Sequence, residues 1–156
     1  MANTQSMCTS FMGELLTATH NFGTAPTRGA STADTFKAAL YLTTATVNAS
    51  TTAYSATNEV SGTNYTAGGV SISGWNAPTA TNSSSTAGVA FTTPTASISY
   101  TSVTLSTAFD CVLIYNSTQS NKAVSVHTFG SQTITAGTFT LTMPTNSATN
   151  ALIRMD

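Results

Sequence analysis

The chain has 156 residues, a length typical of one domain, and only 6% of them are charged, with a formal net charge of −1. An ordinary soluble domain carries about 25% charged residues. Nucleic acids and anionic membrane surfaces are bound by clustered Lys and Arg, so this composition excludes both kinds of partner.

Hydroxyl side chains take the place of the missing charges, with 34 Thr and 20 Ser in the chain. A disordered chain with such a composition would lack aromatic residues, but 7 Phe, 5 Tyr and 1 Trp are present. The branched Cβ of Thr favours a half-buried strand. The composition therefore predicts a folded, mainly β protein. The near-neutral surface favours a protein that functions in an assembly, because there is little electrostatic repulsion between copies.

The N-terminal part of the chain contains the best helix candidate, residues 6–20. Its apolar side chains recur at spacings of three and four residues, as in one stripe of an amphipathic helix: Phe11, Met12, Leu15 and Leu16. We expect the stripe to pack on a sheet, and a helix that docks on a partner is the alternative. The N-terminal helix and arm would span residues 1–33, and the β part residues 34–156, within one domain.

Strand-like segments follow to the end of the chain. They are residues 36–42, 58–65, 70–73, 88–92, 96–105, 108–115, 124–129, 132–135, 138–143 and 151–155, with helix as an alternative for the first. Residues 76–87 are rich in Ser, Thr and Asn and predict an exposed loop. Short strands at such close spacing predict a β-sandwich, such as a jelly roll, in which Thr faces water or a neighbouring copy.

Motifs of catalysis are missing from the sequence. The chain has two histidines, His20 and His127, few acids, and no G-x-S-x-G elbow. We interpret each histidine as a surface or strand residue, and the alternation around His127 points its side chain outward. The sequence predicts that the protein is not an enzyme.

Motifs of metal, phosphate and dinucleotide binding are missing as well, so we expect no cofactor. The two cysteines, Cys8 and Cys111, are predicted to be reduced and partly buried thiols.

Four aromatic residues fall in or beside predicted loops: Tyr54, Tyr65, Trp75 and Tyr100. They could form a platform for a carbohydrate, or lie at the edge of the core or at an interface between copies. An interface with few charges needs an apolar centre. The candidates for that centre are Phe11, Leu15, Tyr54, Tyr65 and Trp75.

Several stretches, in order along most of the chain, resemble small structural proteins of tailed bacteriophages. They are SFMGELL (10–16), HNF (20–22), DTFKAALY (34–41), TTAY (51–54), NEVSGTNYTAGG (58–69), LIYN (113–116) and AGTFTL (136–141). Asp110 and Cys111 depart from the small residues expected there, and the loop at 76–87 looks variable. The group has no catalytic motif to carry over.

The resemblance implies a virion component, most like a capsid decoration (cement) protein. Such a protein would bind the outside of the shell of major capsid protein through its N-terminal segment and one sheet face, and would self-associate, with no small-molecule substrate. The N-terminus has no basic and apolar signal segment, so we expect synthesis in the cytoplasm of a bacterial host. A tail or fibre component, or a carbohydrate-binding β-sandwich module, is the alternative.

Overall fold

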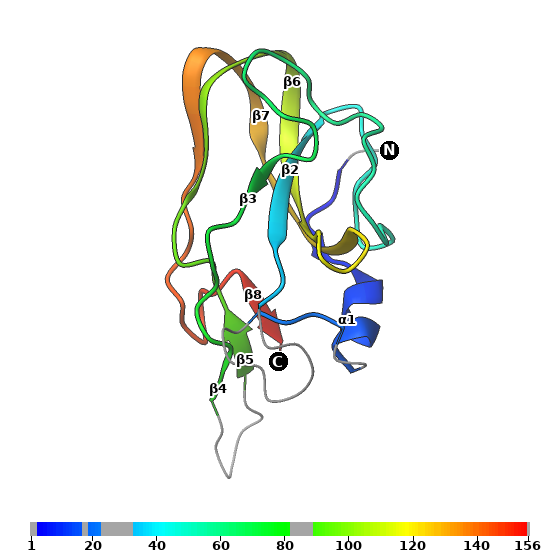
Figure 1. The fold of residues 1–156 in the computed structure, drawn as a ribbon, viewed down its shortest axis with the longest axis vertical. Coiled ribbons are helices and arrows are strands. Elements are labelled where there is room, and N and C mark those ends of the chain that lie inside the picture. The colour runs from blue at the N-terminus through cyan, green and yellow to red at the C-terminus, as the bar shows by residue number, and fades with distance from the viewer. Residues whose placement is uncertain (1–2, 17–18, 23–32, 82–88, 156) are drawn as a thin grey trace.

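The computed structural model describes residues 3–16, 19–22, 33–81 and 89–155. Its elements are β1 (Ser6–Met7), α1 (Thr9–Leu16), β2 (Phe36–Leu42), β3 (Val70–Ser71), β4 (Thr79–Thr81), β5 (Val89–Thr92), β6 (Ile98–Asn116), β7 (Lys122–Leu141) and β8 (Ile153–Met155). One antiparallel sheet has the order β1-β7-β6-β2-β3, and a second has the order β4-β5-β8 (Figure 1). The prediction of a mainly β protein is confirmed.

Two long strands, β6 and β7, form the centre of the fold. In Figure 1 both strands run through the middle of the molecule, turn over at the top of the view and continue down its left side. Their pairing shifts register at several places between Tyr100 and Cys111, and Ser102 and Ala136 have positive φ angles of 54° and 46°. Such bulges bend and twist a ribbon without ending it.

The sequence predicted five short strands where the structure has these two long ones. The predicted strands 96–105 and 108–115 merge into the single strand β6, which begins at Ile98, and the three segments between residues 124 and 143 all fall on β7 or directly after it. Ser106 and Thr107 look like a break between hydrophobic runs, yet both lie within β6. Bulges, which have no strong sequence signature, replace the expected turns.

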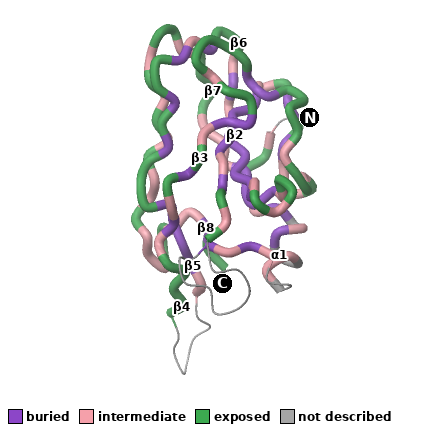
Figure 2. Tube along the Cα trace, in the orientation of Figure 1, coloured by how far each residue is buried: buried purple, intermediate pink, exposed green. Residues whose placement is uncertain are grey.

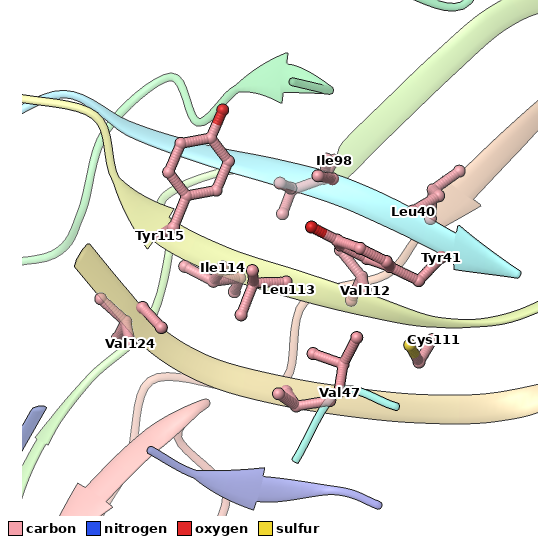
Figure 3. Packing of buried hydrophobic residues seen from close by; sticks show 14 of the residues in the cluster. Leu40, Tyr41, Val47, Ile98, Cys111, Val112, Leu113, Ile114, Tyr115 and Val124 are labelled. Carbon is pink, nitrogen blue, oxygen red and sulfur yellow. The ribbon is translucent and has the colours of Figure 1, made fainter. Parts of the chain in front are cut away.

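Strand β2 spans the predicted residues 36–42, so strand rather than helix is correct there. Its pairing with β6 places Ala39 opposite Leu113, in the centre of the five-stranded sheet. Side chains from β2, β6 and β7 pack together in one core (Figure 3). Figure 2 shows how burial is concentrated in the middle of the molecule, whereas the top of the bent ribbon is largely exposed.

The predicted helix at residues 6–20 is not found over that range. Ser6 and Met7 form β1 and pair with Val126 and Ser125 of β7, so their backbone belongs to the sheet. Helix α1 covers eight residues, Thr9–Leu16, and Cys8 before it is buried in the same core as the strands. Ser6 and Met7 pair with the sheet and do not extend the helix, because a short isolated helix has little intrinsic stability.

Residues 58–65, predicted as a strand, form a loop that is tied to the sheet by single bridges. Asn58 and Asn64 have φ angles of 59°, which a regular strand without a bulge does not accommodate. The bridges join Tyr41 to Glu59 and Thr63 to Thr104. A turn follows at Gly68 and Gly69, which have φ angles of 90° and 71°.

Candidate functional site

A network of polar side chains joins the N-terminal arm to the turn between β6 and β7. In Glu14 of α1, Oε2 lies 2.6 Å from Nε2 of His20, and Oε1 lies 2.5 Å from Nζ of Lys122. Burial alone would raise the pKa of Glu14, but the hydrogen bonds from Lys122 and His20 outweigh it and hold that pKa below its usual value. The carboxylate therefore stays charged and holds a cation and a neutral ring together.

Asn116 at the end of β6 fixes the other side of the His20 ring. Its Nδ2 donates to His20 Nδ1 at 3.1 Å and to Asp34 Oδ2 at 2.7 Å, while its Oδ1 accepts from the backbone nitrogens of Thr118 and Gln119, both at 3.1 Å. A flip of the amide would lose these bonds, so Nδ1 must be an acceptor and the proton must lie on Nε2. Burial lowers the pKa of His20 in agreement with a neutral ring.

His20 was predicted at the surface, and this prediction is wrong. The ring is buried and stands edge-on to Phe11 with ring centroids 4.9 Å apart. The polar network pairs its nitrogens, so burial is tolerated. Its role in the described structure is to position the arm.

A second polar cluster surrounds the buried carboxylate of Glu59. Its Oε1 accepts from the hydroxyl of Tyr65 at 2.7 Å and from the backbone nitrogen of Gly68 at 2.8 Å, and its Oε2 accepts from the hydroxyl of Tyr54 at 2.6 Å. The hydroxyl of Tyr65 in turn accepts from the backbone nitrogen of Leu40 at 3.0 Å. This cluster holds the loop of residues 51–69 against β2.

The tyrosine rings around Glu59 stack inside the molecule. Tyr54 and Tyr115 are parallel with centroids 4.7 Å apart, and Tyr65 and Tyr100 with centroids 5.9 Å apart. Burial and the neighbouring carboxylate raise the pKa of Tyr54 and of Tyr65, and burial with Glu59 raises that of Tyr115 to about 12. All three hydroxyls keep their protons at neutral pH, and each of the four rings has one face covered by its stacking partner.

The other predicted interface residues lie mostly inside an aromatic cluster. Phe11 has no exposed surface and Trp75 is 8% exposed. Phe22 connects them, with ring centroids 5.9 Å from Phe11 and 4.7 Å from Trp75. Leu15 is partly buried against the same core. The structure places Phe11 and Trp75 where their own chain covers them, so they do not form the centre of an open docking surface.

Ser125 and His127 are neighbours on one face of β7, with Ser125 Oγ 2.9 Å from His127 Nε2. His127 is half-buried rather than pointing freely outward, and burial lowers its pKa to about 4. A hydrolytic triad needs a carboxylate on the other ring nitrogen. In the part of the chain that the structure describes, no carboxylate contacts that nitrogen.

A groove of about 270 Å³ opens between the two halves of the bent ribbon beside His127. Most of its walls come from β7 and the segment that follows it. Its apolar lining includes Ile98, Ile114, Phe129, Phe139, Leu141 and Met143. Sequence reasoning missed this groove, because residues far apart along β7 meet only when the ribbon folds over.

The thiols of Cys8 and Cys111 are free and buried, as predicted. Burial raises the pKa of Cys8 to about 11 and that of Cys111 to about 12. Neutral, covered thiols react slowly with oxidants and metals. Over the described residues, no cluster of three or more His, Cys, Asp or Glu side chains is arranged to hold a metal ion.

The outer face of the ribbon carries the hydroxyl side chains. They are exposed at Ser99, Thr101, Thr133, Thr135, Thr138, Thr140 and Thr142. No Asp, Glu, Lys or Arg occurs between Lys122 and Arg154. The prediction that Thr points outward is therefore confirmed here, and the result is a neutral surface with many hydrogen-bonding groups.

In the part of the chain that is described, no helix is long and apolar enough to cross a membrane. Comparison with known proteins found no matching family model, no matching curated protein and no matching solved structure.

Proposed function

We propose that the protein is a non-enzymatic structural protein of a virion, a capsid decoration protein that binds the outer surface of the shell and stabilises it. The observation that carries the proposal is the hydroxyl-rich outer face of the β6–β7 ribbon, together with the lack of any charged residue between Lys122 at the start of β7 and Arg154. A face without charge has little to offer a charged ligand, and it suits repeated contact with a regular protein surface through many weak hydrogen bonds.

The proposal includes a β-sandwich arrangement in which the folded ribbon supplies both layers. The groove between the halves and the contact of Phe109 with Phe139, whose centroids are 5.1 Å apart, support it. The polar network around His20 supports a rigid body whose N-terminal arm is fixed to the sheet. The resemblance to structural proteins of tailed bacteriophages supports the location in a virion.

The structure alters which surface we propose for docking. Phe11 and Trp75 are needed inside the molecule, and Tyr54 and Tyr65 are engaged with Glu59. We therefore move the proposed contact with the shell from these side chains to the outer Thr face of the ribbon. A sugar-binding role has less support, because the aromatic rings that it needs are stacked on one another.

Copy number on purified particles tests the proposal. Particles produced from the genome that encodes this chain would be analysed by quantitative gel densitometry against the shell protein. Hundreds of copies per particle are expected for a decoration protein, and a few copies would indicate a tail or fibre component. Absence from the particle would overturn the virion role.

A salt series on the same particles tests the kind of contact. Few charges mean little Coulomb attraction to screen, so copy number should stay constant from low to near-molar salt. Loss of the protein at high salt would contradict the neutral interface.

A further inference from the structure

The C-terminal half of β7 is an edge in the sheet. Strand β1 pairs with β7 only at Val126 and Ser125, and the described residues place no strand beside the outer side of residues 128–141. The regular end of this edge is Thr138–Leu141, where Leu141, Thr140 and Phe139 pair in step with Ile98, Ser99 and Tyr100 of β6. An edge strand presents a row of N–H and C=O groups that another chain is able to pair with.

Natural edge strands are usually protected by charged side chains, by proline or by a covering segment. Residues 123–153 contain no Asp, Glu, Lys or Arg, and Pro144 comes only after the edge has ended. Thr138, Thr140 and Thr142 are exposed. Nothing in the sequence of this edge opposes pairing with an equally neutral strand.

The apolar groove opens along the same edge. Phe139 and Leu141 are partly buried and line the groove, to which Thr140 also contributes, while Thr138 and Thr140 alternate with them and are exposed. Phe129 approaches Phe139 across the groove, with ring centroids 5.1 Å apart. A strand added at this edge would extend the sheet and would also cover part of these apolar side chains. Association at this edge would therefore bury apolar surface in addition to forming backbone hydrogen bonds.

We propose that a second copy of this chain occupies the edge, pairing residues 138–142, at and directly after the end of β7, with the same residues of its partner, antiparallel across a two-fold axis. With Thr140 at the axis, Thr138 faces Thr142 and Phe139 faces Leu141. The pattern is self-complementary, because the axis keeps hydroxyls on one face and apolar side chains on the other. Thr–Thr and aromatic–aliphatic pairs both favour antiparallel association.

A copy fits better than a charged partner does. Two copies of this segment would not repel each other, because the segment contains no charged side chain. A charged partner would have no side chain of opposite charge to pair with here. The inference specifies the self-association within the proposed function, and its test uses the purified chain without any particle.

Sedimentation of the full chain over a range of concentrations should show a monomer–dimer equilibrium. Thr140→Lys brings two like charges together at the axis and should raise the dimer dissociation constant at least tenfold. Thr101→Lys places the same charge on the same exposed face but on β6, and should leave the constant unchanged. A strictly monomeric wild-type chain, or equal effects of the two variants, would overturn the inference.

Cross-linking checks the position of the axis. Under oxidation Thr140→Cys should form a covalent dimer, because residue 140 meets its own copy, whereas Thr101→Cys should not; the native thiols are buried. Equal cross-linking of both variants would contradict this pairing. If Thr140→Lys is a monomer that still attaches to particles, the proposed decoration role stands. If the chain forms the dimer but does not bind particles, the decoration role is refuted and the dimer inference stands.

Discussion

The side-chain nitrogen of Asn116 lies 3.1 Å from Nδ1 of His20, although the two residues are 96 positions apart in the chain. Asn116 is fully buried, and its amide oxygen is held by the backbone of the turn that follows β6. The orientation of the amide therefore determines which nitrogen of His20 carries the proton. This contact couples the N-terminal arm to the centre of the sheet.

Asn116→Leu should lower the free energy of unfolding by about 2–4 kcal/mol, because it leaves the buried His20 Nδ1 without a donor and removes the acceptor of two backbone N–H groups of the turn. Chemical denaturation at pH 7 measures this change. Asn150→Leu, at an exposed position, is the control and should change stability by less than about 0.5 kcal/mol. Equal losses in both variants would mean that the network contributes nothing specific.

Stability should fall as the pH is lowered from 7 to 5. Burial lowers the pKa of His20 and brings that of His127 to about 4 in the folded protein, so the unfolded chain, with pKa values near 6.5, takes up protons first. Stability is then complete above about pH 6.5, and His127 alone accounts for a loss of about 2 kcal/mol by pH 5. His127→Gln should abolish the part of the decrease in unfolding free energy that is due to His127. If the pH dependence of this variant equals that of the wild type, the burial of the His127 ring is contradicted.

Glu59→Gln should destabilise the fold by about 2–4 kcal/mol. The carboxylate accepts from two tyrosine hydroxyls and one backbone N–H, and an amide group would turn a donor toward one of them. Asp110→Asn is a useful comparison, since a single side-chain contact, from Asn3 at 2.6 Å, reaches that carboxylate in the described structure. Thermal unfolding should show a clearly larger loss for Glu59→Gln than for Asp110→Asn.

Gly69→Ala should be among the most damaging of the conservative changes. A Cβ at this position would lie 1.7 Å from the carbonyl oxygen of Ala38, and the φ angle of 71° is itself unfavourable for alanine. We expect a loss of more than about 2 kcal/mol, through strain and displacement of the loop from β2. Gly130→Ala, where a Cβ meets no atom within 4 Å, should be neutral by comparison.

The two cysteines should react with a thiol-specific disulfide reagent only when the chain unfolds. Both are buried, and their raised pKa values keep them as thiols at neutral pH. Reaction rates with and without denaturant measure this protection. Rapid reaction of either thiol in the native protein would show that the N-terminal arm opens readily.

The sequence alone determined that the protein is mainly β and that its surface carries few charges and many hydroxyls. Alternation of Thr with apolar residues near Thr138–Leu141 predicts strand and the outward direction of the hydroxyls, because side chains of a strand alternate between its faces. The run that includes Leu113 and Ile114 predicted a strand that is buried on both sides, and both residues are buried. Local pattern is sufficient for such features.

Only the tertiary structure decided how those strands are joined and which polar residues matter. Bulges such as that at Ala136 join segments that look separate in the sequence into one long bent strand. Packing against residues that are distant in the sequence offsets the free-energy cost of these bulges, and a short stretch of sequence does not include those residues. Glu14 and Asn116 look like ordinary polar residues until Lys122 and His20, more than 90 positions away along the chain, contact them. Glu59 is surrounded by its own loop, and its carboxylate is buried only because that loop packs against β2. The groove beside Phe139 and the free edge of β7 depend in the same way on the folding-over of the ribbon, because they join surfaces that are distant in sequence.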